Sequence, residues 1–264
     1  MKPVNPFQEI ESEVREIWQQ HWDNLPFAIP KLDAHSYHVT QGIKTLTAVQ
    51  GRKVLDAGSG PGNVSRDLAR CGADVTLLDF TRQALQLGQA SFKKSAQQAR
   101  YIEGSMFYLP LKSNCYDIVF NSGTLEHFFP ELQRQALVEM ARVTKPDGWV
   151  ITFNGYARSI FYRLGKFLLE KSGGWTYGEE FPIYSLERMS SRQMRLMVER
   201  HLGFNGLVIE GFKLLGMEPL TRLLRTIYFR IPTPLTHASD RILSSLFGGY
   251  LLMSAFRKTV RIQS

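Results

Sequence analysis

The amino-acid sequence predicts an α/β protein with a mostly parallel sheet and helices on both faces. Between residues 52 and 154, short apolar segments alternate with segments of helical periodicity, the order that parallel strands with crossover helices require. A glycine-rich turn joins the first of these strands to the first of these helices, as in many α/β ligand sites. The 264 residues are 44% hydrophobic and 21% charged, which excludes a disordered, collagen-like or coiled-coil chain.

The individual elements follow from local periodicity and from their flanking Gly, Pro and Ser residues. Strands are expected at 53–57, 74–79, 100–103, 116–121 and 149–154. Helices are expected at 9–22, 35–49, 63–70, 81–95, 130–143, 159–169 and 190–201. A loop is expected at 173–178, and two late strands at 204–215 and 249–257. A basic, apolar segment at 220–246, interrupted by Pro232 and Pro234, lies between the late strands.

The charge is concentrated in the C-terminal part of the chain. Residues 151–264 carry 16 basic and 8 acidic side chains, a net charge of +8, equal to that of the whole protein. A basic surface of this kind attracts phosphate, an anionic membrane or nucleic acid, and the charge alone does not choose among them. The sequence has no dense Lys/Arg run with interleaved aromatics, the pattern that would indicate a nucleic-acid partner.

Cysteine content and hydropathy indicate a cytoplasmic protein. Cys71 and Cys115 make no disulfide framework, and without a Cys-x-x-Cys pair we expect no metal site. Residues 1–10 lack the apolar core of a secretory signal, and no apolar run reaches the ~20 residues of a membrane helix. Peripheral contact with an anionic membrane through 220–246 is the alternative that the basic segment leaves open.

The glycine-rich turn spans residues 54–62 and favours a cationic ligand. Gly58, Gly60 and Gly62 let the backbone turn tightly and approach a ligand closely. The third glycine comes one position too early for the dinucleotide pattern G-x-G-x-x-G. Asp56, which precedes the first glycine, would repel a pyrophosphate but would attract a positive charge.

Asp79 ends the second predicted strand and has two interpretations. A carboxylate at this position binds both hydroxyls of a ribose through its two oxygens. It also caps a following helix, which here would begin near Thr81. Behind a glycine-rich turn of this kind we favour the ribose interpretation.

From residue 54 to residue 153 the chain resembles the class I S-adenosylmethionine-dependent methyltransferases, of the methyltransferase type 11 kind. Residues 56–62 (DAGSGPG) match the first motif of this family, and 77–80 (LLDF) match its ribose-binding acidic position. Further matching segments are 103–106 (EGSM), 116–121 (YDIVFN), 125–128 (LEHF) and 142–148 (RVTKPDG).

This resemblance implies a Rossmann-like sheet of seven strands, mostly parallel, with the two late strands as an antiparallel edge pair. The cofactor-binding core would occupy residues 51–155, and residues 1–50 would form an N-terminal helical cover. Residues 156–264 would supply the substrate-side cover, the late strands and a basic helical insertion. The three stretches would form one integrated domain.

The resemblance also implies S-adenosylmethionine as the cofactor and a set of residues that bind it. Asp56 would hold the cationic methionine end, and Phe80 and Met106 would enclose the adenine. Ser105 stands where the family commonly has an acidic residue for the adenine amino group. The cofactor-binding residues expected in full are Tyr37, Asp56, Ala57, Gly58, Gly60, Gly62, Asp79, Phe80, Ser105, Met106, Asn121 and Gly123.

His127 and Glu126 are the candidate catalytic residues. A hydroxyl acceptor needs a base, and histidine has a suitable pKa at neutral pH. The alternative is that residues 125–128 only shape a turn. His35 and His38 are expected on a surface helix.

The function predicted from these observations is methyl transfer to the oxygen or nitrogen of a small molecule, such as a glycan precursor or natural product. A lipid-directed methyltransferase at a membrane surface is one alternative, and RNA or protein methylation is another. The sequence predicts neither the acceptor nor the oligomeric state, because function is not encoded in the fold.

Overall fold

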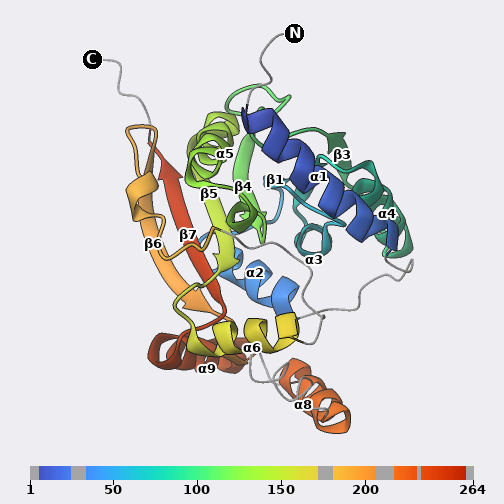
Figure 1. The fold of residues 1–264 in the computed structure, drawn as a ribbon, viewed down its shortest axis with the longest axis vertical. Coiled ribbons are helices and arrows are strands. Elements are labelled where there is room, and N and C mark those ends of the chain that lie inside the picture. Colours follow the sequence, from blue (N-terminus) through green and yellow to red (C-terminus); the bar gives the residue numbers. More distant parts are fainter. Residues whose placement is uncertain (1–5, 25–33, 172–180, 206–216, 231–232, 260–264) are drawn as a thin grey trace.

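A computed structural model describes residues 6–24, 34–171, 181–205, 217–230 and 233–259 of the chain. Within these ranges one seven-stranded sheet has the order β3-β2-β1-β4-β5-β7-β6 (Figure 1). The strands are β1 Lys53–Ala57, β2 Asp74–Asp79, β3 Arg100–Glu103, β4 Tyr116–Ser122, β5 Thr144–Gly155, β6 Met194–Leu202 and β7 Leu251–Lys258. Strands β1 to β5 are parallel, and β7 runs antiparallel to both β5 and β6. The predicted fold class is confirmed.

The helices cover the sheet and extend beyond one end of it (Figure 1). They are α1 Pro6–Asn24, α2 Ala34–Lys44, α3 Asn63–Arg70, α4 Arg82–Lys94, α5 Pro130–Val143, α6 Ile160–Lys171, α8 Glu218–Arg230 and α9 Thr233–Phe247, with a 3-10 turn η1 Leu125–His127. Successive strand residues point to opposite faces, so β1 places Leu55 in the apolar core under α5 and Val54 in the core beside α3. Both cores are buried, as a parallel sheet requires.

The predicted helix at 190–201 is wrong. Met194–Leu202 is strand β6, which pairs along its length with β7. Met, Arg, Leu and Glu favour a helix locally, but pairing with β7 satisfies the backbone and directs Met194 and Leu202 into the core. Local propensity was therefore overridden by tertiary contacts.

The predicted strand at 204–215 is not the partner of β7, because β6 occupies that place. Phe204 and Asn205 are helical, and residues 206–216 lie outside the described ranges. The predicted loop at 173–178 also lies outside them. The other late strand, expected at 249–257, is β7, and the basic segment between the late strands contains α8 and α9.

Two boundaries differ from the prediction by five residues. β5 begins at Thr144, before the predicted Trp149, because Thr144 pairs with Tyr116 and a register irregularity precedes Ile118. α2 ends at Lys44 rather than at Val49, and Val49 instead enters the core beside α3. In the described part of the chain, every helix is too short or too polar to cross a bilayer.

The glycine-rich turn between β1 and α3 depends on left-handed backbone conformations. Gly58, Gly60 and Gly62 have φ angles of +79°, +50° and +70°. At Gly62 a Cβ atom would lie 2.1 Å from Cδ2 of Leu77, whose side chain is fully buried. Position 62 thus excludes a side chain both through its backbone conformation and through its neighbour.

We predict that Gly62→Ala destabilises the protein more than Gly51→Ala does. Gly51 has nearly the same φ, +69°, but a Cβ there would meet no atom within 4 Å. The control substitution costs roughly 1–2 kcal/mol of backbone strain, whereas Gly62→Ala adds roughly 1–3 kcal/mol of overpacking against Leu77. Urea unfolding of the two variants measures the difference. Equal free energies of unfolding would contradict the prediction, because they would show that the Leu77 side chain shifts without loss of stability.

Candidate active site

A cavity of about 240 Å³ lies where β1 and β4 end, beside the glycine-rich turn. The turn contributes Gly58, Ser59 and Pro61, and the two strands contribute Asp56 and Ser122. The first residues of α3 and of α2 complete the lining: Asn63, Val64, His35 and Ser36. The carboxyl ends of neighbouring parallel strands are the usual ligand site of a doubly wound sheet.

Asp56 brings a buried carboxyl group to this cavity. Its side chain accepts a hydrogen bond of 2.7 Å from Ser65 Oγ, and only 3% of its surface is exposed. Burial raises the pKa of Asp56 to about 7, the Ser65 hydrogen bond opposes this shift, and repulsion from Asp79 adds to it. No Lys, Arg or His in the described ranges forms an ion pair with Asp56. A cationic ligand group fits this position because it would supply the missing counter-charge.

Asp79 ties the end of β2 to the glycine-rich turn. Its Oδ2 accepts a hydrogen bond of 2.8 Å from the Gly60 amide, and its Oδ1 accepts two from Thr81, from the amide and the hydroxyl. Burial raises the pKa of Asp79, and these hydrogen bonds oppose the shift. The capping contact with Thr81 is therefore present, while the ribose contact stays a prediction.

Asn121 fixes the end of β4 beside the end of β1, and Gly123 fixes it beside β5. The amide nitrogen of Asn121 donates a hydrogen bond to the carbonyl oxygen of Ala57. The Oδ1 atom of Asn121 is buried and has no hydrogen-bond partner among the described residues. Gly123, with φ at +69°, donates its amide to the Phe153 carbonyl at 2.8 Å. A buried acceptor without a donor is a position where a ligand amine fits.

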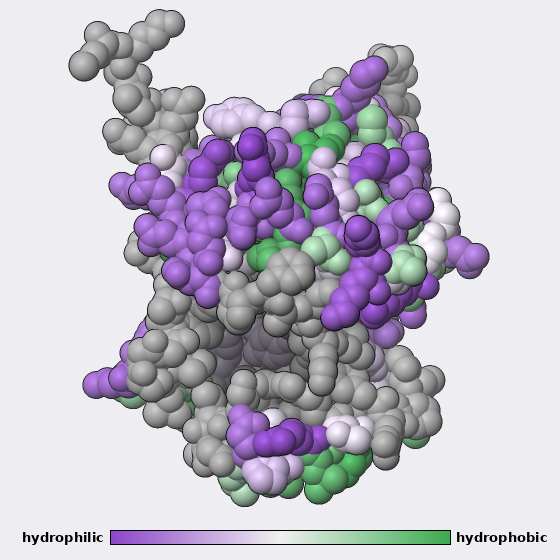
Figure 2. All heavy atoms as spheres, turned by 90° about the vertical axis from the view of Figure 1, so that its right-hand side faces the viewer, coloured by the Kyte–Doolittle hydropathy of each residue, from purple (hydrophilic) through white to green (hydrophobic). Residues whose placement is uncertain are grey.

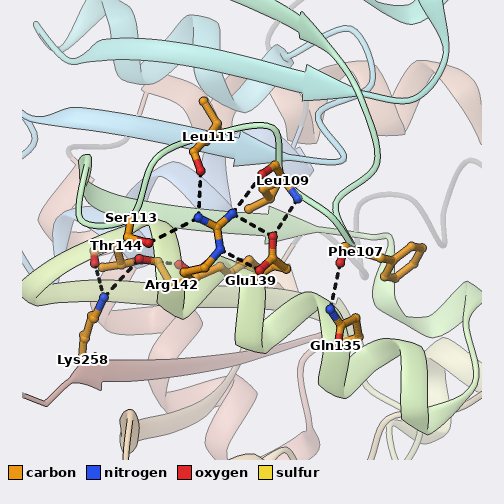
Figure 3. Close-up of polar contacts among 10 residues, drawn as sticks. Phe107, Leu109, Leu111, Ser113, Gln135, Glu139, Arg142, Thr144 and Lys258 are labelled. Carbon is orange, nitrogen blue, oxygen red and sulfur yellow. Dashed lines mark hydrogen bonds and ion pairs between the residues drawn. The ribbon is translucent and has the colours of Figure 1, made fainter.

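The loop that carries Ser105 and Met106 is fastened to α5 (Figure 3). Arg142 binds the Leu109 and Leu111 carbonyls and pairs with Glu139, which accepts the Leu109 amide. Further along α5, Gln135 donates to the Phe107 carbonyl. Met106 is buried in the apolar core, and Ser105 Oγ accepts the Phe107 amide. Their predicted contacts with adenine stay predictions.

Helix α1 lies across the glycine-rich turn (Figure 1). A Cβ at position 60 would lie 3.2 Å from Trp22, and the Arg15 guanidinium lies 5.4 Å from the centre of the Phe80 ring. The Trp18 and His127 rings meet edge to face, with centroids 5.3 Å apart. Helix α1 therefore packs against the turn, Phe80 and His127.

The two candidate catalytic residues lie in η1, outside the lining of the cavity. Glu126 is buried, and its Oε1 accepts a hydrogen bond of 3.0 Å from the Gly155 amide, which fixes η1 to the end of β5. His127 is buried next to Trp18, and its amide donates to the Thr124 carbonyl. Their catalytic role stays a prediction.

A different histidine faces the cavity. His35 is half-buried, with Nε2 at 2.9 Å from Ser122 Oγ and Nδ1 at 3.4 Å from the Tyr250 hydroxyl. His38 is buried, with Nδ1 at 3.6 Å from an Asp240 oxygen. The expectation of two surface histidines was therefore wrong. The local sequence shows no sign that α9 and β7, which are far away in the sequence, cover α2.

Tyr37, like His38, contacts helix α9. Its hydroxyl lies 2.9 Å from Thr236 Oγ1 on α9, and it is not part of the cavity lining. Its predicted contact with the cofactor stays a prediction. No sequence signal identified Ser122 or Tyr250, because neither belongs to a motif.

Comparison with known proteins agrees with this geometry. Residues 55–152 match a family model described as a methyltransferase domain. The chain is 35% identical over 109 residues to a demethylmenaquinone methyltransferase of Renibacterium salmoninarum, covering 41% of this chain and 44% of the relative. It is 37% identical over 108 residues to a malonyl-[acyl-carrier protein] O-methyltransferase of Pectobacterium atrosepticum, covering 41% and 40%. Each match thus spans less than half of the relative's length.

The fold also has solved counterparts. The structure of magnesium protoporphyrin IX methyltransferase from Synechocystis PCC 6803 with bound SAH superposes with a TM-score of 0.52 at 17% identity, over 98% of this chain and 90% of that one. At this identity the similarity concerns the fold alone. The family match, the glycine-rich turn and the strand order together identify residues 55–152 as a class I, S-adenosylmethionine-dependent methyltransferase domain.

Proposed function

We propose that this protein transfers a methyl group from S-adenosylmethionine to an oxygen or nitrogen atom of a small-molecule acceptor. The observation that carries the proposal is the cavity at the ends of β1 and β4. There the Asp56 carboxyl group, which has no cationic partner among the described residues, and the His35 imidazole both line one space beside a glycine-rich turn. A cation-binding group would serve the cofactor, and a base would serve a hydroxyl acceptor.

The residues of the chain fit the cofactor. Asp56 would bind its ammonium group, the Asn121 Oδ1 atom would accept a hydrogen bond from it, and the Asp79 carboxylate would face its ribose. Phe80 and Met106 would flank the adenine. The bound cofactor supplies a methyl group on a cationic sulfur, which needs an aligned nucleophile and little further activation.

His35 is the base that the geometry favours. Its imidazole lines the cavity between Ser122 and Tyr250, and these two partners hold the ring in one orientation. An imidazole accepts a proton from a hydroxyl or ammonium acceptor near neutral pH. His127, by contrast, packs against Trp18, and Glu126 holds the Gly155 amide, so we assign them to positioning η1.

The acceptor class rests on the relatives. The two that we compare are named for different acceptors, demethylmenaquinone and malonyl-[acyl-carrier protein], so the matched domain does not fix one compound. We propose a small-molecule acceptor and keep lipid, RNA and protein as outcomes of the test below.

We predict that Asp56→Asn both stabilises the protein and weakens cofactor binding. Because burial raises the pKa of Asp56 from 3.8 to about 7, the native state holds a proton that the unfolded state releases. The contribution of Asp56 to the free energy of unfolding therefore falls as pH rises from about 4 to about 7. Asparagine does not ionise, so the variant should have a free energy of unfolding roughly 2–4 kcal/mol higher than that of wild type at pH 8. Denaturant unfolding at several pH values measures this gain.

In the same variant, cofactor affinity measured by calorimetry falls roughly tenfold to a hundredfold with the lost charged hydrogen bond. Asp117→Asn is the matched control. Lys53 and Lys145 hold the pKa of Asp117 below its usual value despite partial burial, so this variant loses stability above pH 4 and keeps cofactor affinity. An Asp56→Asn protein that is less stable than wild type at pH 8, or that binds the cofactor unchanged, contradicts the assignment.

A label-transfer assay tests the reaction and the base. The protein is incubated with methyl-labelled cofactor and a cell extract, which is then separated into small-molecule, lipid, RNA and protein fractions. We expect label among the small molecules. With His35→Gln we expect the rate of transfer to fall about a hundredfold or more, with cofactor affinity retained. Label in RNA or protein rejects the proposed acceptor class, and full activity of His35→Gln, with loss in His127→Gln, returns the role to His127.

A further inference from the structure

Helix α9 has its polar side buried. Thr236, Asp240 and Ser244, four residues apart, are 3%, 4% and 0% exposed. The Asp240 carboxylate accepts the Gly203 and Asn205 amides, each at 3.0 Å, and Ser244 Oγ accepts the Phe204 amide at 3.1 Å. This polar stripe satisfies the backbone that leaves β6.

The opposite side of α9 is apolar and exposed. Leu235, Ile242 and Leu246 lie on one stripe, since seven and eleven residues correspond to about two and three helical turns. Their side chains are 62%, 57% and 69% exposed. A globular helix ordinarily turns its apolar stripe inward, so the reversed polarity of α9 indicates a surface that binds an apolar medium.

Two other helices present apolar side chains at the same end of the molecule (Figure 1). On α6, Ile160, Leu164 and Phe167 form a stripe with exposures of 74%, 54% and 52%. On α8, Leu223 and Ile227, one turn apart, are 55% and 46% exposed, and Figure 2 shows apolar groups among polar ones at this lower end. We call these eight side chains of α6, α8 and α9 the apolar end.

Two arginines, Arg200 and Arg241, lie beside the apolar end and form no ion pair within the part of the chain that the structure describes. A cavity of about 360 Å³ between α2, β6 and α9 is lined by Arg200 and Arg241. The Nε atom of Arg200 is buried and has no hydrogen-bond partner among the described residues, while its guanidinium also contacts Thr45 Oγ1. Burial and the nearby Arg241 charge lower the pKa of Arg200, so an anion would stabilise both. The Asp240 carboxylate in this cavity is already bound to backbone amides.

We propose that the apolar end docks on a membrane surface that contains anionic phospholipid. Leu235, Ile242, Leu246 and the exposed stripes of α6 and α8 would enter the headgroup boundary, as amphipathic helices do. Arg222 and Arg241 would meet lipid phosphates at its edge, with one phosphate in the Arg200–Arg241 cavity. The inference concerns where the protein binds and holds whichever acceptor is methylated.

Charge favours a membrane over a second copy of the chain as the occupant. The three helices carry seven basic residues and three acidic ones, and one of those three, Asp240, is buried. A symmetric dimer through this end would oppose the arginines of one copy to those of the other. An anionic bilayer instead satisfies the charge and the apolar side chains together.

Vesicle sedimentation tests the proposal. The full chain is mixed with vesicles of phosphatidylcholine alone or of equal parts phosphatidylcholine and phosphatidylglycerol. We expect binding to the anionic vesicles only, weakened by salt. The double variant Arg222→Gln and Arg241→Gln should bind about thirtyfold more weakly, at roughly 1 kcal/mol for each charge. Lys112→Gln with Arg134→Gln removes the same charge from exposed sites near and on α5 and should bind like wild type.

The apolar stripe is tested separately. Changing Leu235, Ile242 and Leu246 to Ser should weaken binding at least about tenfold, whereas Tyr108→Ser with Val138→Ser, exposed elsewhere, should not. These side chains are on the surface, so circular dichroism should show folded variants. The proposal is overturned if the wild-type protein does not bind anionic vesicles, or if the variants bind them as strongly as wild type does. It is also overturned if the wild-type protein is a dimer and the apolar variant is a monomer. If inorganic phosphate stabilises the protein against unfolding and the protein does not bind vesicles, the cavity is a site for soluble phosphate instead.

Discussion

The candidate active site depends on a buried carboxyl group that forms no ion pair with any residue in the described ranges. Asp56 is buried at the end of β1, and a single hydroxyl, that of Ser65, opposes the cost of burial. The surrounding backbone is arranged accordingly: three glycines in left-handed conformations form the turn, and Asp79 fixes the Gly60 amide. A second buried acid near the first raises the cost further. Such a site is stable because the strands on both sides hold it in place, and a cationic ligand, as we propose, would balance its charge.

The region from β1 to α5 could be predicted because each signal in it is local. The bounds of β1, β2, β3, α3 and α5 in the structure are those expected from the sequence, since apolar runs of fixed length are bounded by Gly, Pro or Asp there. The region after β5 could not be predicted in the same way. The strand β6 reads as a helix by composition, and only its pairing with β7, some fifty residues later in the chain, determines its conformation. Non-local pairing leaves a weak trace in the sequence.

The candidate site shows the same division. The turn, Asp56 and Asp79 were predicted because their spacing is itself a motif. His35 was not, because its place beside Ser122 and Tyr250 results from three elements that meet only in the folded chain. His127 stood in a motif and therefore attracted the catalytic assignment, yet it packs against Trp18 of α1. A motif shows that a residue type recurs, and the folded geometry shows which atoms reach the cavity.

Helix α2 connects the two surfaces for which we propose functions. Its first turn lines the cavity through His35 and Ser36, and the next residues, Tyr37 and His38, contact Thr236 and Asp240 on α9. The polar stripe of α9 therefore has two partners, the backbone after β6 and the helix that forms one wall of the cavity. Polar contacts of this kind explain why α9 turns its apolar stripe outward: its inner face is committed to holding α2 in place. The proposed membrane surface on the outer side of α9 is therefore connected to the proposed base, His35, through contacts between α9 and α2.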